Sequence, residues 1–172
     1  MNEQRIPIFY ACDDNFVKYA VVSLYSMIKN ASPNHRYHVH FLHTGISAPM
    51  METVLALADQ RFEISFDDVT EYMQSISDKL PIRDYYSKTT YYRLFIAEMF
   101  PEYNKAIYID SDTVVQGDIS ELYRTDLKDA YVGACHEQAM VQVDEYGTYV
   151  EKVIGVSRYN FFNAGLMLIN CD

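Results

Sequence analysis

Two aspartates that flank a serine, Asp110 and Asp112, are the residues of this chain best suited to chemistry. They follow the apolar run 106–109, a pattern that predicts a buried strand. In an extended segment, residues i and i+2 project from the same side, so both carboxylates can converge on one cation. Hard oxygen ligands suit Mg²⁺ or Mn²⁺. By itself, however, an Asp-x-Asp tripeptide also occurs in loops that hold no metal.

A second polar cluster, residues 13–15, follows the apolar run 6–11, which predicts another buried strand. Apolar residues then recur at three and four positions over 17–28, the period of a helix that Asn15 would cap. Both clusters therefore stand at the ends of predicted strands. In open α/β sheets, ligands bind beyond the carboxyl ends of the strands. We expect the two clusters to contribute to one site, and capping does not exclude binding.

The elements that would position these residues alternate between strand and helix, which predicts an α/β fold with parallel strands at the centre of its sheet. The segment 138–159 is polar and has no firm periodicity. His38 and His40 share one face of a predicted strand; without an evident third ligand, a solvated face is favoured over a metal site. Strands are expected over 6–11, 37–44, 62–66, 105–109, 131–135 and 164–169, and helices over 17–28, 47–58, 69–76, 90–99 and 119–124.

Length and charge narrow the class of protein. At about 150 residues per domain, 172 residues predict a single domain over 1–172. The 14 Lys and Arg against 24 Asp and Glu give a net charge of −10, which disfavours nucleic-acid binding. The chain has no signal-peptide pattern and no run approaching the ~18 apolar residues of a transmembrane helix. Its three cysteines have no metal-site spacing, so we expect a reducing, cytoplasmic location.

The common nucleotide-binding and hydrolase motifs are missing from the sequence. It contains no G-x-G-x-x-G, no G-x-x-x-x-G-K-[ST] and no G-x-S-x-G. A glycine-rich phosphate loop is therefore not available to a bound nucleotide. A cation held by carboxylates can neutralise phosphate in its place. A nucleotidyltransferase on a similar scaffold would need a glycine-rich loop after the first strand, where this chain has Ala11-Cys-Asp-Asp.

Four segments, in order, make the chain similar to glycosyltransferase family 8, which includes glycogenin and bacterial lipopolysaccharide galactosyl- and glucosyltransferases. The resemblance runs over 6–170 and implies a GT-A fold, a mixed, mainly parallel sheet flanked by helices. It also implies a metal-dependent, retaining transfer of glucose or galactose from a UDP-sugar to a saccharide acceptor of the glycan or lipopolysaccharide type. The segments are Ala11–Phe16, Thr89–Leu94, Ile107–Asp112 and Phe162–Gly165.

By this resemblance, the first strand end and the serine of the Asp-x-Asp motif hold the nucleoside. Ala11, Asp13 and Asn15 would line the uridine site. Phe16 would stack on uracil, at a position where relatives often have tyrosine. Ser111 would lie against the ribose. The resemblance thus gives the cluster after the first strand a binding role in addition to any capping role.

The same resemblance also indicates which residues would contact the phosphates and the sugar of the donor. Asp110 and Asp112 would hold Mn²⁺, or Mg²⁺, that bridges the two phosphates. Arg93 would contact the donor near the phosphates or the sugar, although an ordinary surface arginine is an equal alternative from the sequence. Asn163 would face the donor sugar. Glu137 stands where relatives place an acidic residue beside that sugar, so Glu137 is the candidate catalytic residue. Retention can use a carboxylate nucleophile or attack from the leaving-group face, and both remain open.

The chain departs from the family pattern at its end. Relatives carry an Asp/Asn-Gln-Asp-like segment and a later His-x-x-Gly-x-x-Lys-Pro-Trp-like stretch, whereas this sequence stops at Asp172 and has no tryptophan. We therefore expect the donor-binding part of a longer enzyme, with any peripheral membrane contact made by the missing C-terminal region. The alternative is a non-catalytic domain that binds a nucleotide sugar or a metal.

Overall fold

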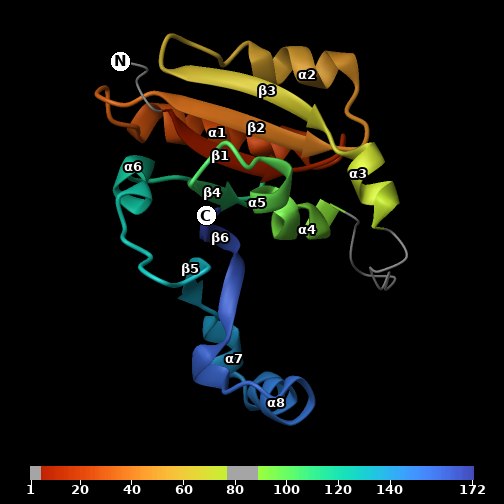
Figure 1. Cartoon of the computed structure of the whole chain (residues 1–172), viewed down its shortest axis with the longest axis vertical. Coiled ribbons are helices and arrows are strands. Elements are labelled where there is room, and N and C mark those ends of the chain that lie inside the picture. Colours follow the sequence, from red (N-terminus) through yellow and green to blue (C-terminus); the bar gives the residue numbers. More distant parts are fainter. Residues whose placement is uncertain (1–4, 77–88) are drawn as a thin grey trace.

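A computed structural model of the chain describes residues 5–76 and 89–172. Its centre is a six-stranded sheet with the order β3-β2-β1-β4-β6-β5 (Figure 1). The first four strands of that order run parallel, whereas β6 is antiparallel to both β4 and β5. The expected parallel centre is confirmed. The strands are β1 Ile6–Ala11, β2 Tyr37–His43, β3 Phe62–Asp68, β4 Lys105–Ile109, β5 Val132–His136 and β6 Phe162–Asn170.

Helices connect these strands, and α7 and α8 extend away from the sheet beyond β5 and β6 (Figure 1). Within the described ranges, none of the helices has the length and apolar character needed to cross a bilayer. The α-helices are α1 Val17–Asn30, α2 Ala48–Leu55, α3 Thr70–Ser75, α4 Thr89–Tyr92, α5 Ile96–Met99, α6 Ile119–Tyr123, α7 Gln138–Gln142 and α8 Asp144–Tyr149. Two 3₁₀ turns, η2 Arg93–Phe95 and η4 Arg158–Asn160, and a π-helix, η3 Val150–Ile154, complete the elements.

The core forms two layers because side chains alternate across the strands. On β1, Ile8 and Tyr10 pack toward Leu24 of α1, whereas Phe9 packs on the opposite face with Ile96 of α5. All five side chains are fully buried. Burial on both faces explains why β1 reads as a continuous apolar run rather than as an alternating one. The strand is consequently fixed at the centre of the domain.

The start of α1 differs from the prediction that Asn15 caps it. Phe16 occupies the capping position and makes no side-chain cap bond. Instead, the Asp13 Oδ1 accepts the backbone N–H groups of Asn15 at 2.9 Å and Phe16 at 3.1 Å. An aspartate commonly closes a turn in this way, two and three residues before its partners. Asp13 therefore shapes the turn, and Asn15 stays exposed.

Two segments differ in regularity from the prediction: residues 90–99 are less regular than expected, and residues 138–159 are more regular. The helix expected over 90–99 consists of α4, η2 and α5, and its short pieces bend the chain at Phe95. The segment 138–159, expected to lack periodicity, contains α7, α8 and η3. Arg158 pairs with Asp144 and Glu151 at 3.1 Å each, which ties this segment together through charges. Short helices held by polar contacts leave no amphipathic period in the sequence.

The face of His38 and His40 is not solvated, contrary to the favoured interpretation. His40 is 3% exposed and contacts the Asp67 carboxylate at 3.0 Å and the Tyr103 hydroxyl at 2.9 Å. His38 contacts the same hydroxyl at 3.1 Å and the Ser65 hydroxyl at 3.1 Å. The two rings lie 3.9 Å apart. The histidines therefore belong to a covered hydrogen-bond network.

This network predicts a loss of stability in acid. Burial, and then the neighbouring His40, lower the pKa of His38, while Glu63 opposes the shift. Because the unfolded chain takes up this proton near its ordinary pKa of about 6.5, folding stability is lost as the pH falls below that value. His38→Gln should show a smaller decrease in unfolding free energy than wild type between about pH 7 and pH 5, measured with denaturant. The exposed-site variant His136→Gln should behave like wild type; equal decreases in all three proteins would contradict the prediction.

Candidate active site

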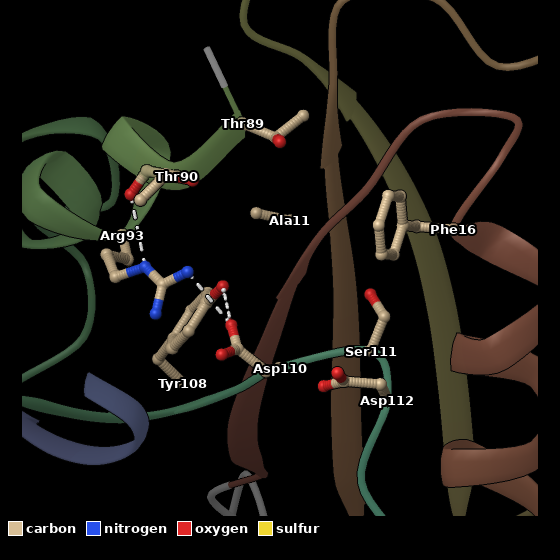
Figure 2. Close-up of a pocket in the computed structure, with 9 residues that line it drawn as sticks. All are labelled: Ala11, Phe16, Thr89, Thr90, Arg93, Tyr108, Asp110, Ser111 and Asp112. Atoms are coloured by element: carbon tan, nitrogen blue, oxygen red, sulfur yellow. Dashed lines mark hydrogen bonds and ion pairs between the residues drawn. The ribbon is translucent and has the colours of Figure 1, made fainter. Parts of the chain in front are cut away.

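A hollow of about 170 Å³ opens at the carboxyl ends of β1 and β4 (Figure 2). These neighbouring parallel strands lie where the strand order reverses, since β1 pairs with β2 on one side and with β4 on the other. Ligands of α/β proteins bind at such a switch point. The residues that line the hollow are Ala11, Phe16, Thr89, Thr90, Arg93, Tyr108, Asp110, Ser111 and Asp112.

Six of the predicted site residues meet in this hollow, although they come from three parts of the chain. They are Ala11, Phe16, Arg93, Asp110, Ser111 and Asp112. The other four, Asp13, Asn15, Glu137 and Asn163, are not among its lining residues. The structure therefore brings the expected metal pair, the arginine and the aromatic residue together. The individual roles assigned to these residues remain predictions.

Asp110 is held by two donors on one oxygen. Its Oδ1 accepts the Tyr108 hydroxyl at 2.7 Å and pairs with Arg93 Nη2 at 2.9 Å (Figure 2). Arg93 also donates to the backbone oxygens of Ala164 at 2.6 Å and Thr90 at 3.1 Å. Its guanidinium lies over the Tyr108 ring, 4.4 Å from the centroid. With its side chain 12% exposed, Arg93 is not an ordinary surface arginine.

Strand β6 connects Glu137 and Asn163 to Asp110 through a chain of hydrogen bonds. The Asp110 N–H donates to the Gly165 oxygen at 2.7 Å. The Gly165 N–H donates to Asn163 Oδ1 at 2.8 Å, and Asn163 Nδ2 donates to Glu137 Oε2 at 2.7 Å. Glu137 Oε1 accepts the Ala139 N–H at 3.2 Å, at the start of α7. Both Glu137 oxygens are thus engaged, so the residue orients Asn163 as well as capping a helix.

Glycine is required at position 165 because two side chains lie very close to the backbone there. A Cβ at this position would meet Asp110 Oδ2 at 2.7 Å and Asn163 Oδ1 at 2.9 Å. Both distances are shorter than van der Waals contact with carbon permits. Only glycine therefore lets the Asp110 carboxylate and the Asn163 amide occupy their observed positions beside residue 165.

Ser111 presents a buried hydroxyl to the hollow. Its Oγ has no hydrogen-bond partner of normal geometry in the part of the chain that the structure describes. The nearby Cys12 thiol is a weak partner. Burial raises the pKa of Cys12 to about 12, so it stays neutral. A buried hydroxyl without a strong partner is costly unless a ligand completes its bonding, which fits the expectation that Ser111 contacts one.

The entrance of the hollow is formed by the chain between β1 and α1. Phe16 is 50% exposed there, and its ring centroid lies 5.9 Å from that of Tyr19. An exposed ring beside a polar hollow is a suitable surface for stacking a nucleobase. Asp14 Oδ1 accepts the Ser47 N–H at 2.7 Å and fixes this loop against the start of α2. Asp13 and Asn15 belong to the same loop, between Ala11 and Phe16, which both line the hollow.

The carboxylates of Asp110 and Asp112 fit a divalent cation by chemistry. Both line the hollow, and Asp112 is exposed. Residues 5–76 and 89–172 contain no group of three or more His, Cys, Asp or Glu that could hold a metal ion. An ion here would consequently take two carboxylates from the described chain and fill its other positions with ligand oxygens or water. Mg²⁺ and Mn²⁺ are commonly bound in this way beside phosphates.

Several contributors were not predicted from the sequence. Thr89 and Thr90 line the hollow, but only their place in a recognised segment drew attention to them. Tyr108 lines its floor and is fully buried. Its position two residues before Asp110 places it on the same side of the chain, a signal that was available. Burial raises the pKa of Tyr108 above its ordinary value, so the hydroxyl remains a donor.

Comparison with known proteins identifies a family for this chain. Residues 7–172 match Glycosyl transferase family 8. A putative glycosyltransferase of Haemophilus influenzae is 30% identical over 170 residues, which are 98% of this chain and 49% of that protein. Glycosyltransferase 8 domain-containing protein 1 of Danio rerio is 28% identical over 134 residues, 78% of this chain and 36% of that protein. The chain thus spans half the length, or less, of these relatives.

Two solved structures share the fold over nearly the whole chain. The bifunctional glycosyltransferase WbbM superposes with a TM-score of 0.83 at 26% identity, covering 99% of this chain and 32% of WbbM. The galactosyltransferase LgtC, solved in complex with donor and acceptor sugar analogs, gives 0.76 at 27% identity, covering 96% of this chain and 58% of LgtC. These neighbours confirm the expected GT-A fold. The chain therefore belongs to glycosyl transferase family 8.

Proposed function

We propose that this chain forms the donor side of a retaining glycosyltransferase, which transfers glucose or galactose from a UDP-sugar to a saccharide acceptor. The observation that carries the proposal is the meeting of Asp110, Asp112 and Arg93 in one hollow at the switch point of the sheet. Two carboxylates and a guanidinium suit a diphosphate with its cation. The similarity to LgtC, whose structure holds donor and acceptor sugar analogs, supports the same assignment.

The size of the hollow indicates which part of the donor it would hold. At about 170 Å³ it is smaller than the ~300–1,000 Å³ of typical small-molecule sites. Its lining includes the charged groups of Arg93, Asp110 and Asp112. We therefore assign the diphosphate to the hollow, the uracil to the exposed Phe16 ring, and the ribose to Ser111. The sugar would extend toward Asn163, which β6 holds beside Asp110.

The chemistry that these residues would support is departure of a diphosphate. Asp110 and Asp112 would hold Mn²⁺ or Mg²⁺, which when bound supplies Lewis-acid stabilisation of the charge that grows on the leaving phosphate. Arg93 would add a fixed positive charge at the same place, already oriented by the Ala164 and Thr90 oxygens. A preoriented charge needs little reorganisation as the glycosidic bond breaks, which favours the transition state over the ground state.

Glu137 and Asn163 would orient the sugar. The Glu137 carboxylate accepts from the Asn163 amide at 2.7 Å, so it fixes which way that amide points. We assign Glu137 this positioning role, because both of its oxygens already accept hydrogen bonds. Retention would then use a carboxylate nucleophile from elsewhere or attack from the leaving-group face, and the acceptor-binding residues would decide between them.

A binding-only domain is the second candidate. It rests on the same contacts, since Asp110, Asp112 and Arg93 could bind a donor without transferring its sugar. The two functions separate on turnover. UDP release from a panel of UDP-sugars, with saccharide acceptors present, supports the transferase; donor binding by this chain with no release supports the binding-only domain.

We predict that UDP stabilises this chain only together with Mn²⁺ or Mg²⁺. A ligand at about 100 times its dissociation constant contributes about 2.7 kcal/mol. For a chain of this length, that corresponds to a rise in Tm of about 5–10 °C. The measurement is thermal unfolding with UDP and the ion, with UDP and a chelator, and with the ion alone. An equal shift in the chelator would reject the metal-dependent site.

A further inference from the structure

We propose that Tyr108 is a positioning residue for the cation site: its hydroxyl fixes the Asp110 carboxylate in the orientation that binds the ion. The inference rests on the proposed function and extends it to a residue outside the Asp-x-Asp motif. Its basis is the 2.7 Å hydrogen bond from the Tyr108 hydroxyl to Asp110 Oδ1. Figure 2 shows the ring next to this carboxylate and to the Arg93 guanidinium.

The tyrosine is itself held in place. Tyr108 is 0% exposed and belongs to the core layer that contains Phe9 and Ile96. Its strand β4 is paired on both sides, with β1 and β6. A side chain with this packing has little freedom, so its hydroxyl is a fixed point at the edge of the hollow. A carboxylate bonded to a fixed point has fewer orientations available than one exposed at a strand end.

Arg93 contacts the same oxygen but can replace this function only in part. Arg93 comes from the short turn η2, and it also bonds backbone oxygens of two other segments. Tyr108, in contrast, lies two residues before Asp110 on the same chain segment. It therefore sets the carboxylate relative to its own strand, while its ring supports the guanidinium at 4.4 Å. One buried side chain thus positions both charged groups of the hollow.

Hydrogen bonds to metal ligands commonly change metal affinity by about 10–100-fold when they are removed. For Tyr108→Phe we expect the lower end, about tenfold, because Arg93 still holds Asp110 Oδ1 at 2.9 Å. The phenylalanine keeps the ring that packs in the core and supports Arg93. The change should therefore act on the ion rather than on the fold.

The experiment measures the Mn²⁺ concentration that half-saturates UDP binding, by calorimetry and by the paramagnetic signal of Mn²⁺. The wild-type chain, Tyr108→Phe and a matched control, Tyr103→Phe, are compared. The control also removes a hydroxyl that makes hydrogen bonds, since Tyr103 contacts His38 and His40. That hydrogen-bond network lies outside the hollow. The expected result is a tenfold rise for Tyr108→Phe and no change for Tyr103→Phe.

A second measurement separates positioning from general destabilisation. In the Asp112→Asn background, Asp110 is the remaining carboxylate of the pair, and Tyr108→Phe should again weaken Mn²⁺ binding. In the Asp110→Ala background, the same change should have no further effect, because the side chain that Tyr108 bonds has gone. An unchanged half-saturating concentration in a folded Tyr108→Phe protein, or an equal effect in both backgrounds, would overturn the inference. Wild-type binding that ignores Mn²⁺ would instead overturn the proposed function, and with it this inference.

Discussion

Asp110→Asn is expected to raise the Mn²⁺ concentration needed for UDP binding by at least about 100-fold. Loss of a hydrogen bond behind a metal ligand already costs about 10–100-fold, so loss of the ligand's charge should cost at least as much. The substitution keeps the shape of the side chain and an oxygen that can accept from Tyr108. What it removes is the charge that Arg93 contacts and that the ion would bind.

The same variant should lose some stability, and this distinguishes the two aspartates. Arg93 is 12% exposed, so it would keep a partly buried charge without its partner. Breaking a fully buried pair costs about 3–5 kcal/mol. Because the Asp110 side chain is 34% exposed, we expect about 1–2 kcal/mol here. Asp112→Asn should instead weaken Mn²⁺ binding while changing the unfolding free energy by less than about 0.5 kcal/mol, as at other exposed positions.

The measurements are titration of Mn²⁺ at saturating UDP and denaturant unfolding of each variant. Asp129→Asn, at an exposed position before β5, serves as the charge-matched control and should behave like wild type. Ion-dependent UDP binding that persists in both Asp110→Asn and Asp112→Asn would exclude these carboxylates as the cation ligands.

The sequence predicted the position of this site better than its internal contacts. Continuous apolar runs identified β1 and β4, because both strands are buried on both faces. A strand end followed by Asp110 and Asp112 then placed the carboxylates at the correct edge of the sheet. These inferences depend only on neighbours along the chain. For that reason they could be made without knowledge of the strand order.

The contacts of Arg93 could not be predicted in this way. Its partner Ala164 is 71 residues away in sequence, and the two meet only because β6 joins the sheet antiparallel to β4. Asn163 was placed near the sugar by resemblance alone; its link to Asp110 through Gly165 is a property of that strand pairing. Likewise, the sequence predicted a solvated His40, because no residue near it in the chain indicates that Tyr103 covers it.

Gly165→Ala provides the sharpest test of whether the site depends on this close packing. The added Cβ would meet Asp110 Oδ2 at 2.7 Å and Asn163 Oδ1 at 2.9 Å, so at least one of these side chains must move. Disturbing the groups that orient a metal ligand commonly costs about 10–100-fold in metal affinity, and we expect Mn²⁺-dependent UDP binding to weaken within that range. Overpacking should also lower the unfolding free energy by about 1–3 kcal/mol.

Gly117→Ala is the matched control, since a Cβ there meets no atom within 4 Å. Both substitutions remove the same backbone freedom, and neither glycine has a positive φ, so they differ in the space available rather than in backbone strain. Mn²⁺ titration and denaturant unfolding should find Gly117→Ala close to wild type. If Gly165→Ala binds UDP and Mn²⁺ as the wild type does, the Asp110 carboxylate can move away from residue 165 without loss of affinity. Ion binding would then not depend on the observed position of this carboxylate. A loss confined to Gly165→Ala would instead show that ion binding needs the Asp110 carboxylate in the place where the close approach of Gly165 leaves it.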